Sequence, residues 1–133
     1  MRSIKEILAG TLERQKDLAA AYLFGSQTTD SKHRDSDVDV ALLFQRGRVP
    51  GTDQLLQLQD ELTSALQKET DLVVLNDNSP IICMQVLQKG VKIVERDRRA
   101  VNEFMVRTMN EYDDLKRVRS VIEKKISRGR IYG

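Results

Sequence analysis

The chain has 133 residues, of which 40% are hydrophobic and 32% charged, with a formal net charge of +2. This length predicts one domain with a real core. No apolar run approaches the roughly 18–20 residues of a membrane span, and the first residues lack the apolar region of a signal peptide, so we expect a cytoplasmic protein without membrane contact. One cysteine excludes an internal disulfide and a cysteine-based zinc cluster.

The first half of the chain predicts a helix followed by two strands. Ser3 and Glu6 have the spacing of a capping box, and apolar residues follow at helical spacing. Residues 19–24 are apolar nearly throughout, which predicts a strand covered on both faces. Residues 27–36 are a polar connection, whose first positions we expect to form a short helix with its N-terminus toward a phosphate group. Residues 37–43 predict the second strand.

The second half alternates helices and strands. Leucines at positions 55, 58, 62 and 66 predict an amphipathic helix whose apolar stripe packs in the core, with Asp53 in its first turn. Residues 71–75 predict a third strand. Ser79 and Pro80 are typical of a helix start, Gly90 of its end, and residues 91–94 of a short strand.

A long helix is predicted from Asp97 to near Gly129, roughly thirty residues or about 45 Å. Such a helix is longer than a small domain, and residues 96–133 hold 11 Lys or Arg against 6 Asp or Glu, whereas residues 1–95 hold 11 against 14. The basic outer turns fit either a solvated face or a partner. We therefore expect a core at 1–96 and a helix at 97–133 that packs on it and extends to a partner, within a single mixed α/β or α+β domain.

Two aspartates lie on one face of the second predicted strand. Side chains alternate along a strand, so Asp37 and Asp39 point the same way, about 7 Å apart at Cα. Both could reach a pair of divalent ions roughly 3.5–4 Å apart. Gly25 allows close backbone approach to a phosphate, and Ser26 adds a hydroxyl beside backbone amides. These features favour metal-assisted phosphoryl or nucleotidyl transfer.

Other interpretations of these residues are weaker. An EF-hand loop starting at Asp35 needs Gly and Glu where Val40 and Arg46 stand. A solvated strand edge with exposed aspartates is the other alternative, but two aspartates on one face repel each other unless a cation lies between them. A solvated His33 and a buried, inert Cys83 are the simpler interpretations of those two side chains.

Gly25-Ser26, ten intervening residues and Asp37-Val38-Asp39 resemble the signature of the DNA polymerase β-like nucleotidyltransferases. The similarity is greatest to the minimal nucleotidyltransferase group, whose members are often antitoxins encoded beside a HEPN-domain toxin. It covers about residues 18–112. The resemblance implies a mixed sheet of about four strands with flanking helices.

The resemblance also implies a site and a reaction. Asp71 would join Asp37 and Asp39 as the third catalytic carboxylate, and the three would hold two Mg²⁺ ions. Gly25, Ser26 and Arg34 would bind the nucleotide. ATP is the implied donor and a hydroxyl, as on tyrosine, of a HEPN toxin the implied acceptor, within a heteromeric complex.

Three alternatives stay open. The chain could neutralise a toxin by stoichiometric binding through its long helix, without catalysis. It could transfer a nucleotide to a small molecule, although it lacks a clear second substrate domain. Nucleic acid is the weakest choice of partner, because the basic arm lacks interleaved aromatic residues.

Overall fold

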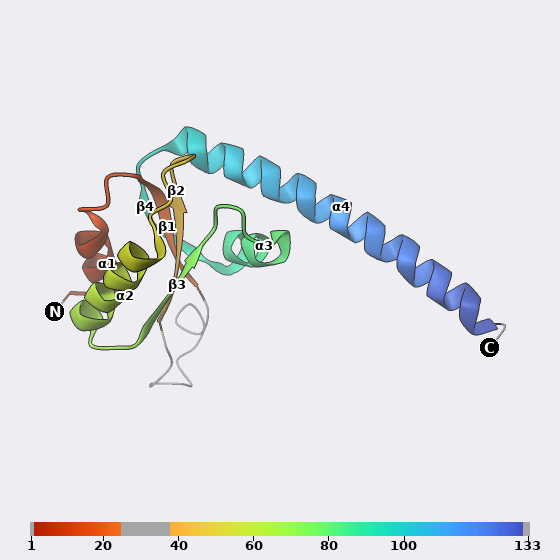
Figure 1. Cartoon of the computed structure of the whole chain (residues 1–133), viewed down its shortest axis with the longest axis horizontal. Helices are drawn as coiled ribbons and strands as arrows, with labels where there is room; N and C mark the ends of the chain where they lie inside the picture. Colours follow the sequence, from red (N-terminus) through yellow and green to blue (C-terminus); the bar gives the residue numbers. More distant parts are fainter. Residues whose placement is uncertain (1, 25–37, 132–133) are drawn as a thin grey trace.

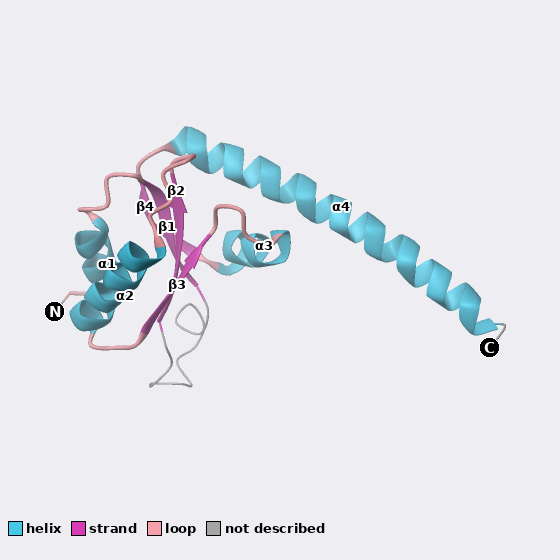
Figure 2. Ribbon diagram, in the orientation of Figure 1, coloured by secondary structure: helices cyan, strands magenta, loops and turns pink. Residues whose placement is uncertain are grey.

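The computed structural model describes residues 2–24 and 38–131, with side chains described as far as residue 126. Helices and strands follow one another in the order that the sequence predicts (Figure 2). The elements are α1 (Ile4–Leu12), β1 (Leu18–Phe24), β2 (Val38–Phe44), α2 (Thr52–Leu66), β3 (Thr70–Val74), α3 (Pro80–Lys89), β4 (Val91–Glu95) and α4 (Arg98–Ile131).

The strands form one mixed sheet in the order β3-β2-β1-β4. β1 pairs antiparallel with both β2 and β4, whereas β2 and β3 run parallel. Parallel neighbours need a crossover connection, and α2 lies within that connection. The predicted mixed α/β architecture is confirmed.

Helices cover both faces of the sheet (Figure 1). On one face, α1 and α2 contribute the buried residues Leu8, Leu12, Leu58 and Leu62 to a cluster with the strands. On the other face, α3 and the start of α4 form a second cluster around Phe104. β1 is buried along almost its whole length, as its apolar sequence predicts.

The predicted helix boundaries have clear local causes. The Glu6 N–H donates to Ser3 Oγ at 3.2 Å, and the Ile81 N–H donates to Ser79 Oγ at 3.1 Å, so both serines act as N-caps. Gly90 ends α3 in an extended conformation, and the position requires glycine because a Cβ there would lie 2.5 Å from the Val86 carbonyl oxygen. The leucine stripe of α2 is core, as predicted.

Arg96 links the segment between β4 and α4 to the end of α1. Its guanidinium donates to the carbonyl oxygens of Gln15 and Leu12, the latter at 3.0 Å. The Leu12 carbonyl belongs to the last turn of α1 and the Gln15 carbonyl lies just beyond it, where a cation also complements the helix dipole. The bonds tie the end of α1 to the segment that precedes α4.

Only the first turns of α4 pack on the core. Val101, Phe104 and Thr108 are buried, and α4 contacts α3 and β1. Beyond them the helix extends well away from the sheet (Figure 1). It has 34 residues, slightly more than the thirty predicted. Within the described ranges, none of the helices has the length and apolar character needed to span a membrane.

Candidate active site

The alternation of β2 determines which way Asp39 points. Val38, Val40 and Leu42 belong to the cluster beneath α1 and α2, whereas Ala41 belongs to the cluster beneath α3 and α4. Asp39 shares the face of Ala41 because side chains two apart in a strand lie on one face. Its half-buried carboxylate therefore points to the α3 and α4 side of the sheet.

Asp71 stands directly beside Asp39 on the neighbouring strand. The two are Cα partners in the parallel β2–β3 pair, and adjacent strands lie about 4.8 Å apart. Partners in register present their side chains to the same face, and Asp71 is also half-buried. Two residues 32 positions apart in sequence are thus brought side by side in the sheet.

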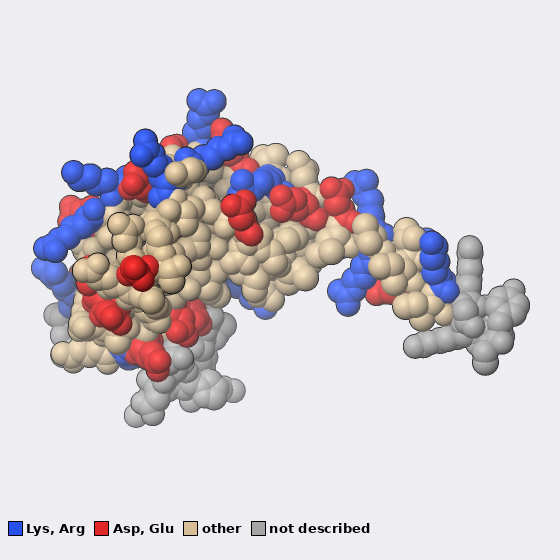
Figure 3. Space-filling model, in the orientation of Figure 1, with Lys and Arg blue, Asp and Glu red and all other residues tan. Residues whose placement is uncertain are grey.

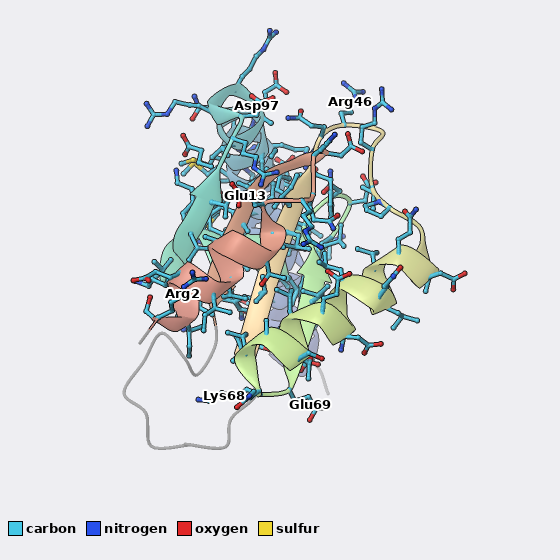
Figure 4. All side chains as sticks on the ribbon, turned by 90° about the vertical axis from the view of Figure 1, so that its left-hand side faces the viewer. Arg2, Glu13, Arg46, Lys68, Glu69 and Asp97 are labelled. Carbon is cyan, nitrogen blue, oxygen red and sulfur yellow. The ribbon has the colours of Figure 1, made fainter. Side chains whose placement is uncertain are left out.

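The start of β3 is fixed by hydrogen bonds around Thr70. Its N–H donates to Thr63 Oγ1 at 3.2 Å, and its buried hydroxyl donates to the Lys68 carbonyl at 3.0 Å. The Val38 N–H donates to the Glu69 carbonyl at 2.9 Å, which aligns the starts of β2 and β3. Figure 4 shows Lys68 and Glu69 at this end of the sheet, opposite Arg46 and Asp97.

The remaining predicted site residues, Gly25, Ser26, Arg34 and Asp37, lie outside the described residues, as does His33. Their chain neighbours are in place: Phe24 ends β1 as the register partner of Asp39. Over residues 2–24 and 38–131, no cluster of three or more His, Cys, Asp or Glu side chains could hold a metal ion.

Comparison with known proteins places this arrangement in a family. The family model described as "Polymerase beta, Nucleotidyltransferase" matches residues 5–99, most of the chain. The chain belongs to the polymerase β nucleotidyltransferase family. Its four-stranded sheet, and the strand that carries Asp39, lie within the matched region.

The relatives of this nucleotidyltransferase include protein adenylyltransferase MntA of Shewanella oneidensis. The two are 33% identical over 109 residues, covering 79% of this chain and 73% of that protein. A crystal structure of a toxin–antitoxin with AMP-PNP has a TM-score of 0.77 at 28% identity, covering 92% of this chain and 98% of the other.

A further similar structure is a tri-AMPylated Shewanella oneidensis HEPN toxin in complex with its MNT antitoxin. The matched chain gives a TM-score of 0.73 at 26% identity, covering 93% of this nucleotidyltransferase and 96% of the other chain. A solved MntA–toxin complex also carries Asp→Glu replacements at two aspartates separated by one residue. This is the spacing of Asp37 and Asp39.

The opposite end of the sheet in this nucleotidyltransferase has a different character. A polar cavity of about 650 Å³ opens where β2 ends, between Arg46, Asn76 and Arg107. The Asn76 side chain already makes two hydrogen bonds there: it accepts from the Phe44 N–H and donates to the Phe44 carbonyl, both at 2.9 Å. The cavity lies at the far end of β2 from Asp39, so it is separate from the carboxylate pair.

Two titratable groups, Tyr22 and Cys83, are buried on the α3 and α4 side of the sheet. Burial, followed by the charge of Glu95, raises the pKa of the Tyr22 hydroxyl. Among the described residues this hydroxyl has no hydrogen-bond partner. Burial also raises the pKa of the Cys83 thiol, and its Sγ lies 3.6 Å from the Leu75 carbonyl oxygen. The prediction that Cys83 is a buried thiol is confirmed.

Sequence reasoning missed the residues that hold the carboxylates in place. Thr70 is the first residue of β3 and Asn76 follows the strand, and their hydrogen bonds fix its two ends on neighbouring segments. The signals were weak, since Thr and Asn are also common in turns. β3 itself begins one residue before the predicted start at Asp71.

Proposed function

We propose that this chain transfers AMP from ATP to a hydroxyl group of a HEPN-domain toxin and thereby acts as its antitoxin. The observation that carries the proposal is the Asp39–Asp71 pair on adjacent parallel strands of a polymerase β nucleotidyltransferase. Support comes from MntA, a protein adenylyltransferase, and from the AMPylated HEPN toxin in complex with its MNT antitoxin. A cytoplasmic location belongs to the proposal, because ATP is the donor.

The carboxylates in this proposal bind Mg²⁺. Carboxylate oxygens are preferred ligands of that ion, and Asp39 and Asp71 face one side of the sheet from neighbouring strands. Asp37, two residues before Asp39, completes the set in the proposal. Two bound Mg²⁺ ions would neutralise charge on the triphosphate during transfer.

The residues of the chain then have distinct roles. Gly25 and Ser26 follow β1 directly and hold the triphosphate, with Arg34 contacting its oxygens. Asp71 accepts the proton of the acceptor hydroxyl. The hydroxyl oxygen forms a bond to the α-phosphorus, the bond from that phosphorus to the bridging oxygen breaks, and pyrophosphate leaves.

The test is transfer of label from ATP to the HEPN-domain protein encoded beside this chain. Labelling should fall by at least about a hundredfold in each of Asp37→Asn, Asp39→Asn and Asp71→Asn. A positioned acid or base typically contributes a factor of about a hundred or more to the rate. Asp60→Asn, at an exposed position on α2, is the matched control and should label normally. Equal labelling by wild type and Asp39→Asn would refute the proposal.

A second candidate function is neutralisation by stoichiometric binding. It is favoured by the exposed apolar side chains on the outer part of α4, which include Leu115 and Ile122. The two functions separate in a toxicity assay. Neutralisation that survives Asp39→Asn but is lost on truncation after Tyr112 would favour binding without catalysis.

A further inference from the structure

One apolar stripe runs along α4 and continues past the end of the core. At about 100° per residue, Val101, Phe104 and Thr108 lie on the same face as the outer residues Leu115, Ile122 and Ile126. The inner three are 3%, 2% and 2% exposed, whereas the outer three are 38%, 51% and 52% exposed. The helix therefore keeps its buried pattern for about 27 Å beyond Thr108, where none of the described helices and strands packs over it.

We name Leu115, Val118, Ile122 and Ile126 the outer stripe. Three of them line a cavity of about 460 Å³ together with Ile81, which lies at the start of α3. Because the outer stripe continues the face that packs on α3, it overlooks the side of the sheet to which Asp39 and Asp71 point. A molecule seated on it lies on the same side as the candidate active site (Figure 1).

The charge around the outer stripe restricts what can cover it. Residues 115–131 hold seven Lys or Arg and one Glu, and Figure 3 shows basic side chains along this part of α4. Two copies of this chain pairing through their outer stripes would bring these like charges together. An acidic surface would instead be attracted, which is the usual form of electrostatic complementarity.

We propose that the outer stripe of α4 and Ile81 form the docking surface for an acidic amphipathic helix of the acceptor protein, seated so that its hydroxyl reaches Asp39 and Asp71. The identity of that protein as the HEPN toxin rests on the proposed function. Apolar contacts at helical spacing hold such a helix in a groove, and Lys116 and Lys125 on either side of the stripe pair with its carboxylates. Docking thereby selects the substrate of the transferase.

The apolar contacts of the docking surface are tested at two neighbouring residues of nearly equal exposure. Ile122 is 51% exposed and lies in the outer stripe, whereas Val121 is 53% exposed and points about 100° away. Calorimetry without ATP should show that Ile122→Asp weakens binding of the purified HEPN-domain protein at least tenfold. Val121→Asp should change it less than twofold, and circular dichroism should show the same helix content in both variants.

The role of the basic side chains beside the outer stripe is tested with two matched double variants. Lys116→Glu with Lys125→Glu changes the charge beside the outer stripe, whereas Arg117→Glu with Lys124→Glu makes the same change on the far side of the helix. The first pair should weaken binding at least tenfold and the second less than threefold. Equal effects from the two pairs would refute an acidic helix on this surface.

Two further results would overturn docking on the outer stripe. One is an equal response of binding to Ile122→Asp and Val121→Asp. The other is a dimer of the isolated chain in light scattering that Ile122→Asp converts to monomer, because the occupant would then be a second copy. Binding is measured without ATP and also with Asp39→Asn, so docking can succeed where the transferase proposal fails. If the docking proposal and the transferase proposal are both correct, Ile122→Asp should raise the KM for the toxin and leave kcat unchanged.

Discussion

The Asp39–Asp71 pair predicts a penalty on folding that a divalent cation relieves. The two residues are register partners on adjacent strands, so their carboxylates can approach to about 5 Å. Two unit charges at about 5 Å repel by roughly 0.8 kcal/mol in water and about 3 kcal/mol at an effective dielectric of 20. Both side chains are half-exposed, so we expect a repulsion between these limits, about 1–2 kcal/mol.

Asp71→Asn removes one of these charges and keeps the size of the side chain. Without divalent ions the variant should be more stable than wild type, with a Tm higher by about 3–6 °C. Saturating Mg²⁺ should stabilise wild type more than the variant, because the variant offers fewer charged ligands.

Thermal unfolding followed by circular dichroism, with and without Mg²⁺, measures both effects. Asp60→Asn on α2 loses the same charge on the other side of the sheet and should respond to Mg²⁺ as wild type does. A lower Tm for Asp71→Asn in metal-free buffer, or an unchanged Mg²⁺ response, would refute this account of the pair.

Three other perturbations have defined outcomes. Asn76→Ala removes two hydrogen bonds to Phe44 and should lower the free energy of unfolding by about 1–3 kcal/mol in urea titrations. Tyr22→Phe removes a buried hydroxyl that has no partner among the described residues, so Tm should not fall. The Ala100 N–H donates to Asp97 Oδ1 and holds the pKa of that carboxyl low, so Asp97→Ala should be less stable than wild type at neutral pH, with the difference vanishing as acid protonates Asp97.

Local patterns in the sequence were sufficient for most elements of the fold. Period-two alternation, helical leucine spacing and the serine caps act within a few residues, so they can be recognised without tertiary structure. Ser3, Ser79 and the leucines of α2 are examples that the structure confirms. The end of α2 was harder, because Gln67 adopts the left-handed conformation where glycine is usual.

Contacts between distant segments could not be predicted in the same way. Arg96 bonds the carbonyl of Leu12 across 84 positions, and nothing near Arg96 in the sequence indicates that partner. The Asp39–Asp71 register has the same character, since it depends on how α2 returns the chain to the sheet. For the site, a family resemblance indicated the candidate carboxylates, whereas the structure supplies the alignment of Asp39 with Asp71.

That alignment depends on both ends of β3. A slip of one residue against β2 would turn Asp71 to the opposite face of the sheet, toward α1 and α2. Hydrogen bonds at both ends of β3 oppose such a slip. At its start the Thr70 N–H donates to Thr63 Oγ1. Beyond its end the Leu75 N–H donates to the Leu42 carbonyl at 2.8 Å, and the Phe44 N–H donates to Asn76 Oδ1. Asn76 lies at the far end of the sheet from the carboxylates, yet it supports their geometry through the register. Its loss should therefore lower nucleotidyl transfer as well as stability, although Asn76 is far from the proposed substrates.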